Sequence, residues 1–185
     1  TSYRNSFLRN LDIHIATARG GNVIGGGDWA KDRLIPDFFK SLEMEQSFKI
    51  RSPDSVRPWQ HVLEPIYGYL MLAEKLVLRG DEYAEAWNFG PNENNMKTVA
   101  EIVDYLLKKT KKIDLIKESQ PEIHETKMLK IDSSKAVLKL GWRQQWDIET
   151  ALNKTIDWYK AWQNKEDLID ITISQISDYE KKLKK

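Results

Sequence analysis

The stretch from Arg19 to Pro36, RGGNVIGGGDWAKDRLIP, constrains the fold of this chain most strongly, because it joins an apolar strand to a helix through glycines and charged residues. An apolar run predicts a short strand over residues 13–19, and apolar residues from Leu34 to Leu42 recur at helical spacing. Glycines lack the Cβ atoms that keep a backbone away from a bound molecule. The polar residues of the stretch are Asn22, Asp28, Lys31 and Arg33. The pattern is typical of a ligand-facing edge, although a glycine-rich surface turn has a similar composition.

A second polar segment, VRPWQHV, runs from Val56 to Val62. Pro58 disfavours the helical conformation for Arg57 and holds it extended. A guanidinium on extended backbone, next to an aromatic ring, is well placed to donate two parallel hydrogen bonds to a phosphate. Taken singly, Arg57 also suits a surface ion pair and Trp59 also suits the core. The order of these residues favours a phosphate contact.

Composition narrows the class of protein. The 185 residues include 29 basic and 28 acidic side chains, so neither a nucleic-acid-binding surface nor an acidic tail is indicated. Seven tryptophans and seven tyrosines favour a packed globule over a disordered chain. The absence of cysteine excludes disulfides and cysteine zinc sites, and three scattered histidines argue against a metal site. No apolar stretch approaches the ~20 residues that span a bilayer, and no leader is visible, so we expect a cytoplasmic protein without a membrane partner.

The order of predicted elements is mixed α/β. A helix follows Pro65 and ends near Gly80, with its apolar residues in one stripe. The stripe consists of Ile66, Tyr69, Leu70, Ala73, Leu76 and Val77. Further on, the sequence predicts strands at 87–89 and 113–116, a helix capped by Thr98 and Glu101, a short helix from 132 or 133 to Gly141, and a longer helix from Asp147. The tail at 165–185 alternates like a strand but also shows one helical face, and we expect a helix with a solvated lysine end.

Several of these motifs together resemble one enzyme family. In order, they are NVIGGGDW, DRLIP, VRPWQHV, GYLMLAEKL, WNFGP, IDSSK and LGW. They are similar to the C-terminal part of the CDP-glucose 4,6-dehydratases, which are extended short-chain dehydrogenase/reductases that act on nucleotide sugars. The GGGDW and RPWQH forms resemble that branch in particular, and the resemblance covers almost the whole chain.

The resemblance implies an α/β fold, namely Rossmann-like sheet strands plus a smaller mixed α/β substrate-binding domain. Residues 1–185 would be the C-terminal portion that contains the nucleotide-sugar-binding domain, and the strands near 13–19 and 87–89 would belong to the Rossmann-like domain. The Gly-x-x-Gly-x-x-Gly turn that receives the dinucleotide pyrophosphate does not occur in the chain, so the N-terminal NAD-binding part is expected to be absent. The catalytic residues, including the family's Tyr-x-x-x-Lys pair, are expected upstream of residue 1.

The activity implied is the NAD-dependent conversion of CDP-glucose to CDP-4-keto-6-deoxyglucose and water. In this reaction the sugar C4 loses hydride to NAD, the 4-keto group acidifies the C5 proton, water leaves from C5 and C6, and the hydride returns to C6. The product is a precursor of deoxy sugars in bacterial surface polysaccharides such as the lipopolysaccharide O antigen. The full-length enzyme is expected to be a homo-oligomer. Alternatives are another nucleotide-sugar dehydratase or epimerase of the superfamily, or a non-catalytic binding module.

The resemblance also assigns residues. Asn22 and Arg57 match groups that bind the substrate diphosphate, and Asn22 with Val23 would approach the nicotinamide end of NAD. The nucleotide is expected against Arg33, Leu34 and Ile35, with its base or ribose near Ile50 and Arg51. His61 would lie near the sugar nucleotide or simply pack, and His124 and Lys127 are candidates in a loop. His14 is expected to be structural. Pro58 stands where other branches have aspartate, so no acidic role transfers to that position.

Overall fold

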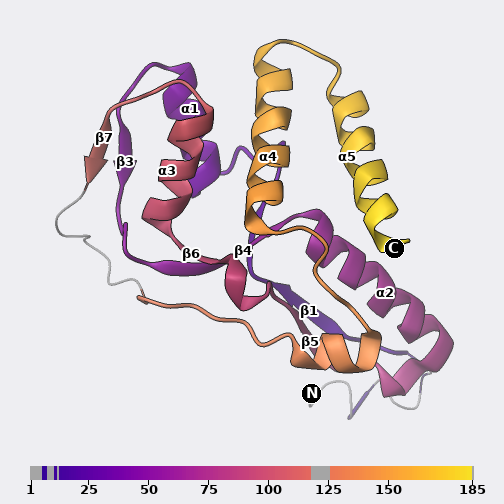
Figure 1. The fold of residues 1–185 in the computed structure, drawn as a ribbon. Coiled ribbons are helices and arrows are strands. Elements are labelled where there is room, and N and C mark those ends of the chain that lie inside the picture. Colours follow the sequence, from indigo (N-terminus) through magenta and orange to yellow (C-terminus); the bar gives the residue numbers. More distant parts are fainter. Residues whose placement is uncertain (1–5, 8–10, 12, 118–125, 185) are drawn as a thin grey trace.

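The structure, a computed structural model, describes residues 6–7, 11, 13–117 and 126–184 (Figure 1). Its elements in chain order are β1 (Thr17–Gly20), β2 (Asn22–Ile24), α1 (Leu34–Glu43), β3 (Phe48–Ile50), β4 (Val56–His61), α2 (Leu63–Arg79), η3 (Gly80–Glu82), β5 (Ala86–Phe89), η4 (Glu93–Asn95), β6 (Met96–Thr98), α3 (Val99–Lys109), β7 (Leu115–Lys117), η5 (Ala136–Leu140), α4 (Ile148–Gln163) and α5 (Leu168–Leu183). The mixed α/β order therefore agrees with the sequence.

The strands form three small sheets. β1 pairs in parallel with β5, and β3 pairs in parallel with β7. The third sheet has the order β2-β4-β6, with β2 parallel and β6 antiparallel to β4. Gly21 lies between β1 and β2, and a Cβ there would stand 2.6 Å from the Pro58 carbonyl oxygen of β4. Only glycine lets the chain pass from one sheet to the next this close to β4.

The larger apolar core lies among α1, α3, α4 and the strands β2, β3 and β4. Phe39 of α1 stacks on Tyr159 of α4 with ring centroids 3.9 Å apart. Helix α3 begins at the predicted capping box, in which the backbone N–H of Glu101 donates to Thr98 and the backbone N–H of Thr98 donates to the Glu101 carboxylate. Helix α4 begins at Asp147, whose side chain accepts from the Thr150 N–H at 2.8 Å. These caps fix the two helices that cover the sheet carrying the site.

A second core joins α2, β5 and η5. Gly68 of α2 sits against Phe89 of β5, where a Cβ would lie 2.3 Å from the ring. The buried residues of α2 are Glu64, Pro65, Gly68 and Leu72. The apolar stripe predicted for this helix is therefore not its packing face: Leu70 is 65% exposed and Val77 is 86% exposed. The close approach of Gly68 to Phe89, which periodicity does not detect, turns the stripe toward solvent.

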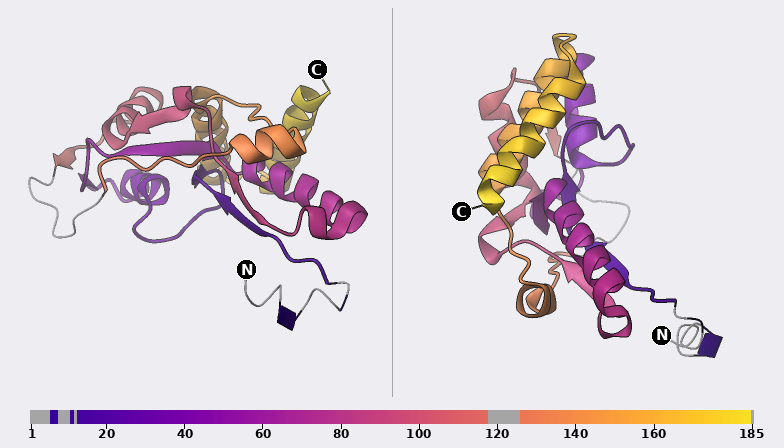
Figure 2. Two further views of the ribbon diagram at one scale, coloured as in Figure 1. Left: turned by 90° about the horizontal axis from the view of Figure 1, so that it is seen from below. Right: turned by 90° about the vertical axis from the view of Figure 1, so that its right-hand side faces the viewer.

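The tail forms helix α5, as preferred from the sequence, and α5 runs alongside α4 (Figure 2). Gln175 of α5 donates to the Lys154 carbonyl of α4 at 2.8 Å, and Lys154 pairs with Asp178 at 2.8 Å. The first strand begins only at Thr17, so His14 precedes it; the His14 ring lies 3.1 Å from Asp81 and covers Gly80. Across the described ranges, no helix is long and apolar enough to cross a membrane.

Candidate functional site

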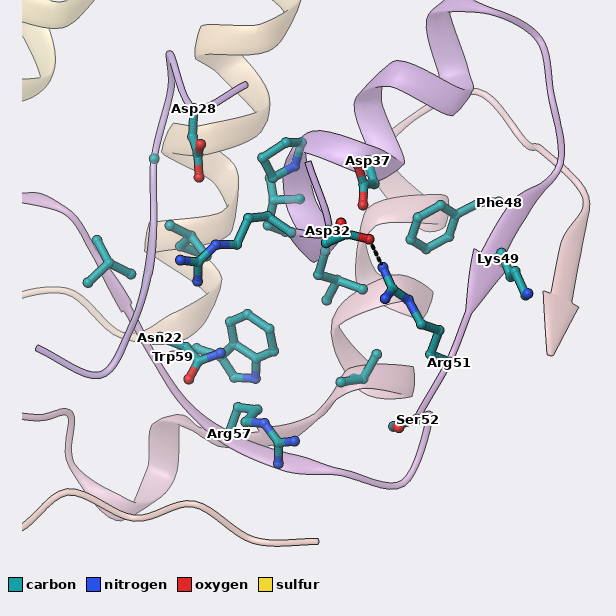
Figure 3. A pocket seen from close by; sticks show the side chains of 18 residues that line it. Asn22, Asp28, Asp32, Asp37, Phe48, Lys49, Arg51, Ser52, Arg57 and Trp59 are labelled. Carbon is teal, nitrogen blue, oxygen red and sulfur yellow. Dashed lines mark hydrogen bonds and ion pairs between the residues drawn. The ribbon is translucent and has the colours of Figure 1, made fainter. Parts of the chain in front are cut away.

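A cavity of about 220 Å³ opens between β2, β4 and the N-terminal end of α1 (Figure 3). Asn22 of β2 lies opposite Trp59 of β4 in the parallel register. Trp59 is 4% exposed, and its indole N–H donates to the Lys97 carbonyl of β6 at 2.9 Å. The ring is thereby fixed across the floor of the cavity.

Arg57 lies on the same side of the cavity as Asn22 (Figure 3). Its Nη1 donates to the Val56 carbonyl at 3.0 Å and to the Thr126 carbonyl at 2.8 Å. Because a guanidinium is planar, these two bonds fix the orientation of the whole group. The side chain therefore holds the segment after Thr126 to β4 while it lines the cavity.

The other side of the cavity carries both signs of charge. Asp32, whose φ is 61°, forms an ion pair with Arg51 at the end of β3. Asp37, in the first turn of α1, lies near this pair (Figure 3). Partial burial, and next the charge of Asp32, raise the pKa of Asp37, while Arg51 and the Asp32 backbone N–H act in the opposite direction. The full lining has four basic residues, Arg33, Lys49, Arg51 and Arg57, and three acidic residues, Asp28, Asp32 and Asp37.

The glycine-rich run leaves space for other side chains of this protein. A Cβ on Gly26 would lie 2.0 Å from Cγ of Trp158 in α4, and a Cβ on Gly25 would lie 2.8 Å from Val62. Gly27 has a φ of +78°, which favours glycine. The Asp28 carbonyl then accepts from the Tyr159 hydroxyl at 2.6 Å. The interpretation that these glycines clear space for a ligand is therefore wrong for Gly26, whose space is taken by Trp158.

The structure brings most of the predicted site residues together. Those that line the cavity are Asn22, Val23, Arg33, Leu34, Ile35, Arg51 and Arg57. Ile50 is 1% exposed and His61 is 2% exposed; both lie beneath the surface and outside the lining. His124 lies outside the described residues. Lys127 is exposed, and its carbonyl accepts from the Val56 N–H at 2.8 Å, but it does not line the cavity.

His61 packs rather than faces the opening. Its ring meets Trp146 edge to face, with centroids 4.8 Å apart, and its Nδ1 lies 3.3 Å from the Leu63 N–H. Burial, and next the charge of Lys154, lower the pKa of His61 to about 4. The imidazole is therefore neutral at physiological pH.

One Tyr-x-x-x-Lys spacing does occur in the chain, at Tyr105 and Lys109. Both residues belong to α3, where the Tyr105 hydroxyl donates to Asn153 at 3.0 Å and the Lys109 ammonium lies 5.7 Å from the ring centroid. Neither residue lines the cavity. This pair therefore does not sit where it could act on a molecule in the cavity.

The lining also contains residues that the sequence does not predict as site residues, among them Asp32, Asp37 and Phe48. Asp32 and Asp37 are the first and last residues of the DRLIPD segment, at the beginning of α1. An acidic residue in the first turn of a helix is ordinarily explained by its interaction with the helix dipole, so the sequence gives no sign that Asp37 lines a cavity. The ion pair between Asp32 and Arg51 could be recognised only from the fold, because the two residues come from different segments of the chain.

Comparison with known proteins finds two curated relatives. The chain is 44% identical to a CDP-glucose 4,6-dehydratase of Salmonella typhimurium, over 97% of this chain and 52% of that protein. It is 25% identical to UDP-glucuronic acid decarboxylase 1 of Xenopus tropicalis, over 84% of this chain and 35% of that protein. The chain thus spans about half or less of the curated relatives it matches. No family model matches the chain.

Solved structures confirm the fold. A dTDP-glucose 4,6-dehydratase of Streptomyces venezuelae, with NAD bound, matches with a TM-score of 0.72 and 20% identity, over 90% of this chain and 48% of that one. A UDP-glucuronic acid 4-epimerase of Bacillus cereus, bound to UDP-glucuronic acid and NAD, matches with a TM-score of 0.71 and 19% identity, over 87% of this chain and 48% of that one. The chain therefore has the α/β fold of about half of each of these two enzymes. The resemblance to CDP-glucose 4,6-dehydratases is likewise confirmed, over nearly the whole chain.

Proposed function

We propose that this chain is the nucleotide-sugar-binding half of a CDP-glucose 4,6-dehydratase, a lyase that releases water and forms CDP-4-keto-6-deoxyglucose. The observation that carries the proposal is the convergence of seven residues, taken from separate motifs, on one cavity. These motifs lie far apart in the sequence, from Asn22 to Arg57, and only the fold brings them together. The similarity to the Salmonella enzyme supports the choice of substrate.

The diphosphate of the substrate would lie against Asn22 and Arg57. The Arg57 guanidinium is oriented by its bonds to the Val56 and Thr126 carbonyls, so little side-chain entropy would be lost on binding. An amide and a guanidinium on one wall can donate several hydrogen bonds to phosphate oxygens. The nucleoside would then extend along Arg33, Leu34 and Ile35 toward Arg51.

This chain offers only part of a binding site for NAD, at the nicotinamide end of the cofactor. Asn22 and Val23 line the cavity, and Val23 is 39% exposed on β2, which suits contact with the nicotinamide end. When bound, NAD supplies a reversible hydride acceptor for the sugar. The residues present fit the nicotinamide end of NAD alone, because the phosphate-binding glycine turn does not occur in the sequence. The proposal therefore assigns most of the cofactor site, and the catalytic residues, to the rest of a longer protein.

The remaining expectations belong to the same proposal. His124 and Lys127 are assigned to the loop near the substrate, and Ile50 and His61 are assigned to support the site from beneath. The full-length protein is expected to be a homo-oligomer in the cytoplasm that supplies deoxy sugars for O-antigen synthesis. Burial supports the assignment of Ile50 and His61, and the resemblance supports the others.

A test compares the 185-residue chain with the full-length protein for turnover of CDP-glucose in the presence of NAD. The 4-keto product is detected by its absorbance in alkali. We expect turnover by the full-length protein and none by the chain. Turnover of a different nucleotide sugar would favour another dehydratase or epimerase, and the absence of any turnover by the full-length protein would favour a binding module. Turnover by the 185-residue chain itself would show that the catalytic residues are misplaced.

A further inference from the structure

The cavity has two chemically different sides. Asn22 and Arg57 lie on one side, whereas Asp32, Asp37 and Arg51 lie on the other (Figure 3). The second side carries the basic residues Lys49 and Arg51 as well, but Arg51 is engaged by Asp32, and the two carboxylates repel the oxygens of a diphosphate. A nucleoside diphosphate bound with its phosphates at Arg57 would then place its base or ribose toward Asp32 and Asp37.

The two carboxylates differ in their surroundings. Asp32 is exposed, and its charge is offset by the ion pair with Arg51. Asp37 is half-buried at the beginning of α1, between the buried residues Pro36 and Phe38. Its raised pKa reflects that burial together with the Asp32 charge. A ligand that donates a hydrogen bond to Asp37 would stabilise its charged form, because such a bond compensates for lost hydration.

The bases of nucleoside diphosphates differ at the position that such a carboxylate would read. Cytosine carries a 4-amino group, which donates hydrogen bonds, whereas uracil and thymine carry a 4-carbonyl oxygen, which accepts them. A carboxylate accepts from the cytosine amino group and repels the carbonyl oxygen of the other two pyrimidines. The chemistry at Asp37 therefore suits cytosine among these three bases.

We propose that Asp37 determines base specificity by accepting a hydrogen bond from the 4-amino group of the cytosine of CDP-glucose. This inference rests on the proposed function, because it presumes that a nucleotide sugar occupies the cavity. Asp32 has a supporting role: its ion pair holds Arg51 at the same side of the cavity.

The test is a calorimetric titration of the full-length protein with three ligands: CDP-glucose, UDP-glucose and the CDP-glucose analogue that lacks the 4-amino group. The native protein should bind CDP-glucose about tenfold or more tightly than either of the others. In the Asp37→Ala variant, CDP-glucose and the analogue should bind with similar affinity, because the partner of the amino group is gone. Removal of the amino group from the ligand and removal of the Asp37 carboxylate from the protein together form a double-mutant cycle, which isolates the contact between the two groups.

Glu43→Gln is the matched control, because Glu43 lies at the far end of α1, outside the cavity lining, and the change removes the same charge. This variant should keep the native preference. Circular dichroism of each variant checks that the fold is retained. If Asp37→Ala does not fold, the analogue titrated into the native protein still tests the contact, since equal binding of CDP-glucose and the analogue would refute it.

The two proposals fail in different ways. If the native protein does not bind CDP-glucose, the proposed function is overturned. If it binds CDP-glucose and UDP-glucose equally well, the role of Asp37 in base specificity is overturned. If the native protein prefers CDP-glucose and Asp37→Ala keeps the full preference for the amino group, only the role of Asp37 is overturned.

Discussion

Replacement of Gly26 by alanine should destabilise the protein through a clash with Trp158. The added Cβ would lie 2.0 Å from Cγ and 2.1 Å from Cδ2 of the indole. The two residues would have to separate by more than 1 Å before reaching ordinary van der Waals contact, which begins at 3.4 Å. The indole cannot move freely, because its N–H donates to Thr172 of α5 at 3.1 Å. Overpacking of this kind costs about 2–3 kcal/mol.

The assay is urea unfolding of the chain, supported by thermal unfolding. For a protein of this size, that loss corresponds to a fall in melting temperature of roughly 5–10 °C. In a Trp158→Ala background the same glycine substitution should cost little, because the obstructing ring is gone.

A second glycine gives the matched control. Gly141 has a φ of +72°, and no atom of the described residues lies within 4 Å of an added Cβ, so Gly141→Ala carries backbone strain without a clash. It should cost about 1–2 kcal/mol, and its cost should not depend on Trp158. Stability of Gly26→Ala equal to that of the native chain, or an equal loss in both backgrounds, would refute the packing explanation.

Three further predictions concern individual side chains. Arg57→Lys in the full-length protein should weaken CDP-glucose binding about ten- to a hundredfold by calorimetry, because an ammonium cannot reproduce paired planar hydrogen bonds; unchanged affinity would place the phosphate contact elsewhere. Burial lowers the pKa of His61 from 6.5 to about 4, so its contribution to stability is present above pH 6.5 and is lost as the pH falls toward 4. The free energy of unfolding, measured by urea unfolding at a series of pH values, should fall by roughly 3 kcal/mol as a result, and a His61→Gln variant should lack this fall. Glu64→Gln should cost about 2–3 kcal/mol in the same assay, since the buried carboxylate accepts from the Gln145 and Trp146 N–H groups and the Tyr179 hydroxyl; a neutral effect would contradict that.

Local chemistry was predictable from the sequence wherever it was decided within a few residues. Thr98 and Glu101 form the expected capping box, and Asp147 caps α4. The tail helix α5 also forms where a helical face was recognised. In each case, the same short-range hydrogen bonds or spacings operate in the isolated segment and in the fold.

Features that depend on tertiary packing were not predictable. Periodicity located the stripe on α2 but not the face that packs, which Gly68 and Phe89 determine. The sequence predicts that the glycines of the first polar stretch leave space for a ligand, whereas Gly26 leaves space for Trp158, a residue far away in the sequence. The sequence could not show that Asp37 shares a cavity with Arg57, because their proximity arises only when α1 and β4 are assembled.

The most direct test of the central claim follows the hydride in the full-length protein. CDP-glucose carrying deuterium at C4 is incubated with the protein and NAD, and the product is examined by mass spectrometry and NMR. The account predicts a product lighter by one water, with a 4-keto group and the deuterium transferred to C6. A product of unchanged mass, as an epimerase would give, or no conversion at all, would contradict it.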